Sequence, residues 1–161
     1  MWIERYFQFR GHSILLRYSR VMDTATTQWY KGIRKSALTP PNWVFSVVWP
    51  ILYITLAIVL VILLTDRRCA APWLCQPLWF FLIQMVLNLS WTTIFFQQRA
   101  PRLALGVLVT IWLFTVFTLI SLWDFERTAY WIMLPYFVWI SFALYLNAVI
   151  VWLNPLSPSK N

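Results

Sequence analysis

Three groups of aromatic and amide residues recur at helical spacing along this chain, and these side chains are the ones best suited to hold a ligand. In the first group, Phe45, Trp49 and Tyr53 follow one another at intervals of four residues. Residues spaced by three or four positions share one face of a helix. Such an aromatic face can anchor a helix in lipid, pack against another helix or form the wall of a pocket, and the spacing alone leaves the three readings open.

The second and third groups add neutral amides to the aromatic rings. The second group shares one helical face and consists of Gln84, Asn88, Trp91 and Phe95. The third shares another face and consists of Tyr136, Trp139, Ala143 and Asn147. Amides in membrane helices commonly hydrogen-bond to a neighbouring helix, so packing is one reading of these faces. The other is a flat-walled, apolar pocket with few polar groups, which suits a rigid planar ligand.

Other kinds of chemistry are not expected. The apolar runs contain no Asp, Glu, Lys, Arg or His, so they offer no proton relay, ion-coupled site or acid–base pair. His12 is the only histidine, and with Cys69 and Cys75 so distant in sequence it does not suggest a metal site. We therefore expect no metal and no cofactor.

The composition indicates that lipid surrounds most of the chain. Of the 161 residues, 61% are hydrophobic and only 11% are charged, whereas soluble domains carry about 25% charged residues. Four uncharged stretches are long enough to cross a bilayer, which takes about 20 residues in a helix. They are residues 44–64, 78–98, 103–123 and 128–153. Tryptophans expected at the membrane interface are Trp43, Trp79, Trp123, Trp131 and Trp152, whereas Trp49, Trp91 and Trp139 lie deeper.

The predicted fold is an all-α integral membrane protein, a compact up-down bundle of transmembrane helices. The connections at 65–77, 99–102 and 124–127 are short, so consecutive helices must be antiparallel neighbours. We expect three parts: an atypical basic and aromatic segment at 1–28, a transmembrane domain at 29–154 and a tail at 155–161. The first segment carries several arginines, which makes a simple spanning helix there too costly.

Basic residues predict the orientation. With four spans, ten Lys or Arg fall on the side of both termini and three on the other. The ten are Arg5, Arg10, Arg17, Arg20, Lys31, Arg34, Lys35, Arg99, Arg102 and Lys160, and the three are Arg67, Arg68 and Arg127. The positive-inside rule then places both termini in the cytosol. The net charge of +8 suits this role and attraction to anionic lipid, not nucleic-acid binding.

Cys69 and Cys75 lie in the connection between the first two spans. They form a disulfide if that loop faces an oxidising compartment, and otherwise they are two free thiols. The sequence leaves both readings open.

Three motifs in this chain resemble those of the family of tryptophan-rich sensory proteins and translocator proteins (TspO, or peripheral benzodiazepine receptors). The first motif consists of Trp29, Tyr30, Lys35, Pro40, Pro41, Trp43, Phe45, Trp49, Leu52 and Tyr53. The second consists of Gln84, Asn88, Trp91, Phe95 and Phe96. The third consists of Pro135, Tyr136, Trp139, Phe142, Ala143 and Asn147. The motifs occur in the family's order and spacing, and the resemblance covers residues 29–154.

The resemblance implies a bundle of five transmembrane helices, a homodimer, and a pocket between the helices under the first loop. Expected ligands are porphyrins and other tetrapyrroles or benzodiazepine-type molecules, and the protein would act as a sensor, carrier or scavenger. Carried over by position, the ligand-binding residues are Tyr30, Pro40, Pro41, Trp49, Tyr53, Asn88, Trp91, Trp139 and Ala143. An alternative is enzyme-like, light-dependent porphyrin degradation with Trp49 and Trp139 as the catalytic pair. A second alternative is a decayed member or a membrane scaffold without a ligand.

Several positions depart from the family pattern. Ser36 replaces the proline of a Lys-Pro pair, and Thr93 replaces the proline that follows the tryptophan within the second motif. No Tyr followed by Arg or Lys comes after Leu146, which counts against cholesterol binding. Residues 1–28 do not read as the family's first helix, so either they take its place or the gene start differs.

Overall fold

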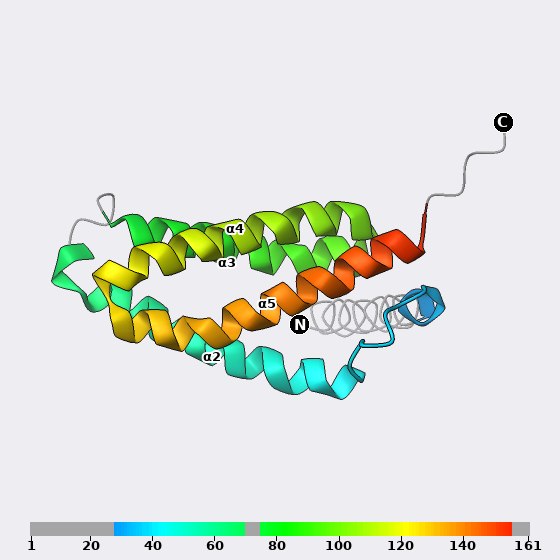
Figure 1. Cartoon of the computed structure of the whole chain (residues 1–161), viewed down its shortest axis with the longest axis horizontal. Coiled ribbons are helices and arrows are strands. Elements are labelled where there is room, and N and C mark those ends of the chain that lie inside the picture. The colour runs from blue at the N-terminus through cyan, green and yellow to red at the C-terminus, as the bar shows by residue number, and fades with distance from the viewer. Residues whose placement is uncertain (1–27, 70–74, 156–161) are drawn as a thin grey trace, which may run out of the picture.

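The computed structural model describes residues 28–69 and 75–155 and consists of four long helices. These are α2 (Asn42–Thr65), α3 (Gln76–Thr92), α4 (Pro101–Phe125) and α5 (Arg127–Leu153) (Figure 1). A π-helical turn, η3 (Thr93–Gln97), extends α3. Shorter helical turns occupy residues 28–32 and η1 (Arg67–Cys69). The described part of the chain contains no β-strand.

All four long helices are long and apolar enough to cross a membrane, α3 together with η3 as one span at Gln76–Gln97. The four predicted spans are therefore confirmed, with ends that lie within two residues of the helix bounds. The chain is an integral, multi-pass membrane protein. The predictions for the segment 1–28 and the tail 155–161 fall almost wholly outside the described residues, and the orientation of the termini stays a prediction.

Prolines mark where three of the helices begin. Pro41 precedes α2 with φ −56° and ψ 149°, Pro77 is the second residue of α3, and Pro101 is the first of α4. The first N–H groups of a helix have no partner within it, so a residue without an N–H costs little there. At the start of α5, the carboxylate of Glu126 instead accepts a hydrogen bond from the N–H of Thr128, at 3.2 Å.

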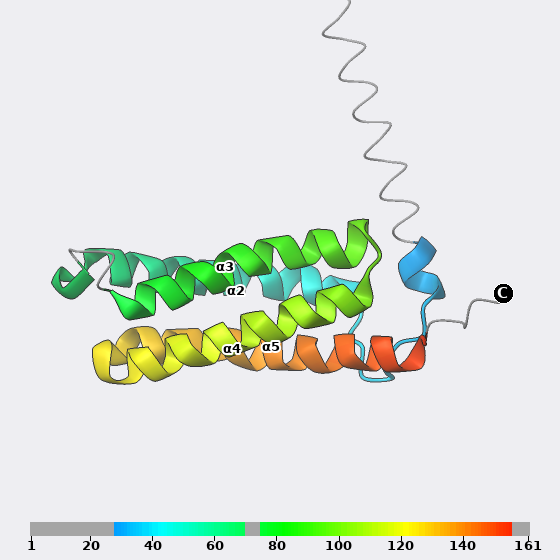
Figure 2. The ribbon, with the colours of Figure 1, turned by 90° about the horizontal axis from the view of Figure 1, so that it is seen from above.

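The helices form an up-down bundle in which α4 packs on α3 and α5, and α2 packs mainly on α5 (Figures 1 and 2). Each helix buries one stripe of side chains, represented by Val59 on α2, Phe81 on α3, Ile111 on α4 and Ile140 on α5. The opposite faces expose large apolar residues, as a helix surrounded by lipid does. The five tryptophans predicted at the membrane interface are all exposed, near helix ends: Trp43, Trp79, Trp123, Trp131 and Trp152.

The connection after α2 is held by one arginine and one disulfide. The Arg68 guanidinium donates to both carboxylate oxygens of Asp66, lies 3.6 Å from Glu126 and stacks 4.0 Å from the centre of the Phe125 ring. Cys69 and Cys75 form a disulfide, and both residues are buried against the helix core. Of the two readings left open by the sequence, the structure has the disulfide.

The disulfide predicts a specific labelling pattern. The protein, extracted from its membrane into denaturing detergent without reductant, should not react with a maleimide, because both thiols are consumed in the bond. After reduction it should take up two labels, measured by mass spectrometry. A Cys69→Ser/Cys75→Ser variant is the control that stays unlabelled in both conditions. Two labels before reduction would mean that this loop carries free thiols.

Candidate ligand-binding site

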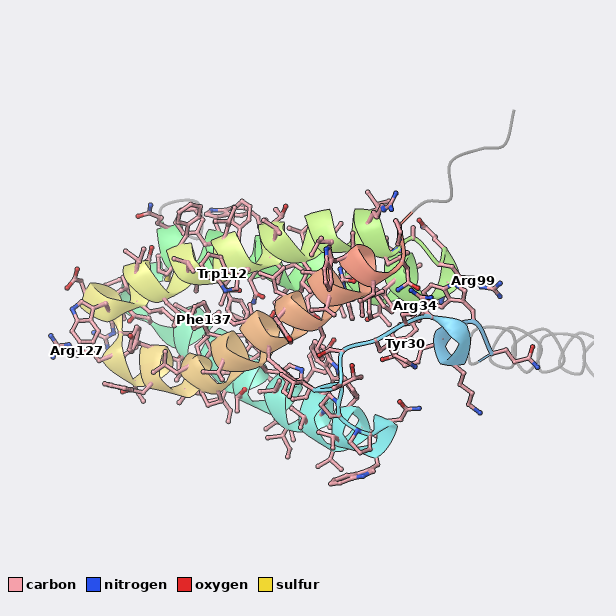
Figure 3. The ribbon with its side chains drawn as sticks, turned by 45° about the vertical axis from the view of Figure 1, so that its right-hand side comes forward. Tyr30, Arg34, Arg99, Trp112, Arg127 and Phe137 are labelled. Carbon is pink, nitrogen blue, oxygen red and sulfur yellow. A yellow bond between two sulfur atoms is a disulfide. The ribbon has the colours of Figure 1, made fainter. Side chains whose placement is uncertain are left out.

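A cavity of about 680 Å³ lies at the end of the bundle where α2 begins and α5 ends. Tyr30 lies at the same end, in the helical turn that sits next to the end of α5 (Figure 3). The lining comes from this turn, α2, the α3–η3 junction and α5: Tyr30, Lys31, Asn42, Phe45, Ser46, Trp49, Pro50, Tyr53, Trp91, Thr92, Phe95, Phe96, Ala143, Leu146, Asn147 and Ile150. Volumes of 300–1,000 Å³ are usual for sites that take a small organic molecule.

Two pairs of stacked rings form the main walls of this cavity. On α2, Trp49 and Tyr53 stack with ring centres 5.6 Å apart and planes inclined by 29°. On the α3–η3 side, Trp91 and Phe95 stack at 5.2 Å and 28°. Pairs of nearly parallel rings present flat apolar surfaces with polarisable faces, onto which another flat ring system can stack.

Irregularities in two helices open the bundle at this end. Pro50 has no N–H, so the carbonyl of Ser46 loses the donor that a regular α-helix would supply. On the other side, the π-helical turn η3 interrupts the α-helical geometry of α3, and Phe95 and Phe96 lie within it. Figure 1 shows α2 diverging from α3 and α4 toward its own first residue. The cavity occupies the space between these altered segments.

A chain of hydrogen bonds across three helices begins at Tyr53 in the cavity lining and continues into the buried core; we name this chain the floor. The Tyr53 hydroxyl donates to Asn88 Oδ1 at 3.0 Å, and Asn88 Nδ2 donates to the Tyr136 hydroxyl at 2.9 Å. The Tyr136 hydroxyl in turn donates to Gln84 Oε1 at 2.7 Å. The chain ends at Gln84 Nε2, which is buried and has no partner among the described residues. Tyr53 belongs to both features, because its ring lines the cavity and its hydroxyl starts the chain.

Tyr30 lines the cavity from the helical turn at residues 28–32. Its ring packs against Phe96 with ring centres 5.6 Å apart and against Phe95 at 6.3 Å. Lys35 holds Tyr30 in place, since its Nζ donates to the Tyr30 carbonyl at 2.7 Å and lies 4.1 Å from the ring centre. Burial raises the pKa of the Tyr30 phenol above its usual value, because the charged form loses its solvation.

The segment between this turn and α2 is fastened to the end of α5. Asn154 makes a two-point contact with the backbone of Arg34: its Oδ1 accepts from the Arg34 N–H at 3.1 Å, and its Nδ2 donates to the Arg34 carbonyl at 2.9 Å. The hydroxyls of Ser36 and Tyr145 are 3.4 Å apart. An amide side chain carries both a hydrogen-bond donor and an acceptor, so it can bond the N–H and the carbonyl of the same residue. Asn154 therefore holds this loop in place, although the loop is not part of a β-sheet.

The structure brings five of the nine predicted ligand-binding residues to the cavity lining: Tyr30, Trp49, Tyr53, Trp91 and Ala143. Asn88 is buried in the floor, behind Tyr53. Trp139 packs against Phe45, with ring centres 5.6 Å apart, and is not part of the lining. Pro40 and Pro41 lie in the loop before α2, also outside the lining. That any of these residues binds a ligand stays a prediction.

Eleven lining residues were not among the predicted ligand-binding set. Phe45, Phe95 and Asn147 belonged to the three helical faces described from the sequence, and the others are Lys31, Asn42, Ser46, Pro50, Thr92, Phe96, Leu146 and Ile150. Spacing could have found several of them. Asn42 and Ser46 precede Trp49 and Tyr53 at the i, i+4, i+7, i+11 positions of one face, and Ile150 follows Ala143 by seven residues.

The fold and the cavity together define a class: integral membrane bundles with an aromatic cavity between their helices. The model of the TspO/MBR family matches residues 12–153. The "Tryptophan-rich protein TspO" of Chlorobaculum tepidum is 34% identical over 131 residues, which is 79% of this chain and 80% of that protein. The "Tryptophan-rich sensory protein" of Cereibacter sphaeroides is 30% identical over 127 residues (79% and 77%). The human "Translocator protein" is 28% identical over 129 residues (80% and 76%).

The chain therefore belongs to the TspO/MBR family. This confirms the family resemblance inferred from the three motifs. The family match begins at residue 12, so it includes part of the segment 1–28 that the motifs did not cover. Membership supports a membrane sensor or ligand-binding role for the protein.

The hydrogen-bonded floor predicts that Tyr136→Phe destabilises the protein. The change leaves Asn88 Nδ2 and Gln84 Oε1 without their hydrogen-bond partner inside the bundle. Interhelical hydrogen bonds contribute about 0.6 kcal/mol each on average, so the loss should be about 1–2 kcal/mol in a detergent unfolding titration. The matched control is Tyr130→Phe, because the Tyr130 ring packs against Trp123 while its hydroxyl makes no hydrogen bond within the described residues. Equal stability of the two variants would show that the floor contributes little.

Proposed function

We propose that this protein binds planar apolar ligands, in particular porphyrins and other tetrapyrroles, in the cavity between α2, the α3–η3 junction and α5. Benzodiazepine-type molecules belong to the same chemical class of flat, largely apolar ligands. The protein would act as a membrane sensor, carrier or scavenger of such molecules. The observation that carries the proposal is the pair of stacked aromatic walls, Trp49 with Tyr53 and Trp91 with Phe95, around one cavity.

The chemistry of the walls supports this choice of ligand. A flat conjugated ring gains dispersion and stacking energy on both faces when it lies between aromatic side chains, with about 0.5–1.5 kcal/mol per ring pair beyond the apolar area that is buried. The polar groups among the described lining residues are neutral apart from Lys31, and most of the lining surface is apolar, so a ligand with a large uncharged body fits best. A small polar metabolite would find few hydrogen-bonding partners there.

The geometry favours binding over light-dependent degradation. Of the tryptophan pair that degradation would use, Trp49 lines the cavity, whereas Trp139 lies behind Phe45. An electron transfer from Trp139 would therefore have to pass another ring. The reading as a scaffold without a ligand is also less well supported, because a scaffold has no use for a cavity of about 680 Å³ in its interior. The homodimer implied by the family resemblance stays a prediction, as does the absence of cholesterol binding.

Removal of one wall tests the proposal. Trp49→Ala should weaken the binding of protoporphyrin IX by about tenfold or more, because it deletes a stacking surface together with its buried apolar area. The dissociation constant can be followed from the absorbance of the porphyrin, with the full-length protein in nanodiscs. Trp152→Ala is the matched control: this tryptophan is 79% exposed, at the end of α5 and outside the cavity lining.

The control separates the cavity from general membrane partitioning. A porphyrin that merely dissolves in the lipid or adheres to exposed tryptophans would respond to both variants alike. Equal affinities in the wild-type protein, Trp49→Ala and Trp152→Ala would therefore rule out the cavity as the binding site.

A further inference from the structure

Charge is distributed unequally between the two ends of the bundle. Among the described residues, the end with the cavity carries five basic residues and no acidic one: Lys31, Arg34, Lys35, Arg99 and Arg102. The opposite end balances three bases with three acids: Arg67, Arg68, Arg127, Asp66, Asp124 and Glu126. Figure 3 shows Arg34 and Arg99 near Tyr30, with Arg127 at the far end. A field of one sign at the mouth of a low-dielectric cavity attracts ions of the opposite sign.

One of these basic side chains belongs to the cavity itself. Among the described residues that line the cavity, Lys31 is the only charged one, and it is exposed. A lysine in this position can lay its apolar stem along the wall while its ammonium group stays in the polar headgroup layer. Lys35, by contrast, is already engaged by the carbonyl and the ring of Tyr30. Within the described part of the chain, no carboxylate forms an ion pair with Lys31.

The neutral groups at this mouth also favour an anion. Asn42, the first residue of α2, lines the cavity, so the positive end of the α2 dipole faces the same opening as Lys31. The amide of Asn42 and the hydroxyl of Ser46 can donate hydrogen bonds there. The deeper walls, in contrast, are aromatic. The inner part of the site is thus apolar, and its opening carries one positive charge, that of Lys31.

From this arrangement we propose that the cavity selects amphipathic acids: ligands with a flat apolar body and a carboxylate at one edge, which pairs with Lys31. The inference rests on the proposed function and adds the charge of the ligand and the residue that recognises it. Such a ligand enters with its apolar part between the ring pairs and leaves its acid group at the basic membrane surface. A neutral analogue fills the same walls and lacks the ion pair.

The test compares an acid with its ester on two variants. Protoporphyrin IX and its dimethyl ester are titrated separately against the full-length protein in nanodiscs of neutral phosphatidylcholine. Lys31→Gln should weaken binding of the acid about threefold, as expected for the loss of an exposed ion pair. It should leave binding of the ester unchanged. Because each ligand is its own reference, different solubilities of acid and ester in lipid cancel from the comparison.

Arg67→Gln is the matched control, since it removes one positive charge from an exposed position at the opposite end. It should change neither affinity. The effect of Lys31→Gln on the acid should also shrink as salt is raised from about 0.01 M to about 1 M, because the screening length falls from about 30 Å to about 3 Å. An equal effect on acid and ester, or no effect on either, would overturn the assignment of Lys31.

Two further results distinguish a ligand carboxylate from a lipid phosphate as the partner of Lys31, and distinguish failure of the charge selection from failure of the proposed porphyrin binding. If the acid-specific effect of Lys31→Gln disappears when phosphatidylglycerol is added to the nanodiscs, a lipid phosphate occupies the position beside Lys31 and the carboxylate assignment is wrong. Persistence of the effect supports it. If both porphyrins bind wild type and Lys31→Gln alike, the proposed function stands and the charge selection fails. If neither porphyrin binds the wild-type protein, both fail.

Discussion

The hydrogen-bonded chain from Tyr53 through Asn88 and Tyr136 to Gln84 is the constraint on which the rest of the structure depends. Lipid offers no partners to polar side chains, so amides and hydroxyls inside the bundle must find one another. This chain ties α2, α3 and α5 together near the middle of these helices. On one side of it the helices pack closely around buried residues such as Val59 and Met133. On the other side they separate and leave the cavity.

The separation follows from local sequence. Pro50 removes a backbone donor from α2, and the π-helical turn at the end of α3 alters the direction in which Phe95 and Phe96 point. Both changes lie a turn or two beyond the floor. The loop between residues 33 and 41 does not have to be rigid by itself, because Asn154 fastens it to α5. A membrane protein can thus keep a cavity of this size within a stable bundle.

Much of the fold was predictable from the sequence, because it depends on composition and on short-range spacing. Four uncharged runs predicted four spans, and three motifs predicted the family. The aromatic face of Phe45, Trp49 and Tyr53 could be placed on one side of α2, and all three residues line the cavity. The Cys69–Cys75 bond could only be left open, since the spacing of two cysteines does not fix their oxidation state.

The details that were missed depend on how separate helices meet. Arg34 and Asn154 are 120 positions apart, so no local pattern connects them. Trp139 shares a helical face with Ala143, yet its ring turns to Phe45, and only the arrangement of α2 against α5 decides this. From the sequence, Tyr136 is only one of several aromatic residues on the same helical face. Its role at the centre of the floor follows from the amides of α3, which reach it across the helix interface.

The central claim is that a planar ligand lies between the two stacked ring pairs. Crystals of the full-length protein grown with zinc protoporphyrin would test it most directly, because anomalous scattering at the zinc edge locates the metal at the centre of the macrocycle without any assumption about the protein. We expect one zinc peak inside the cavity, between Trp49 and Trp91 and on the side of the floor that faces Lys31. A peak on the lipid-facing surface, with the cavity empty of porphyrin, would contradict the account.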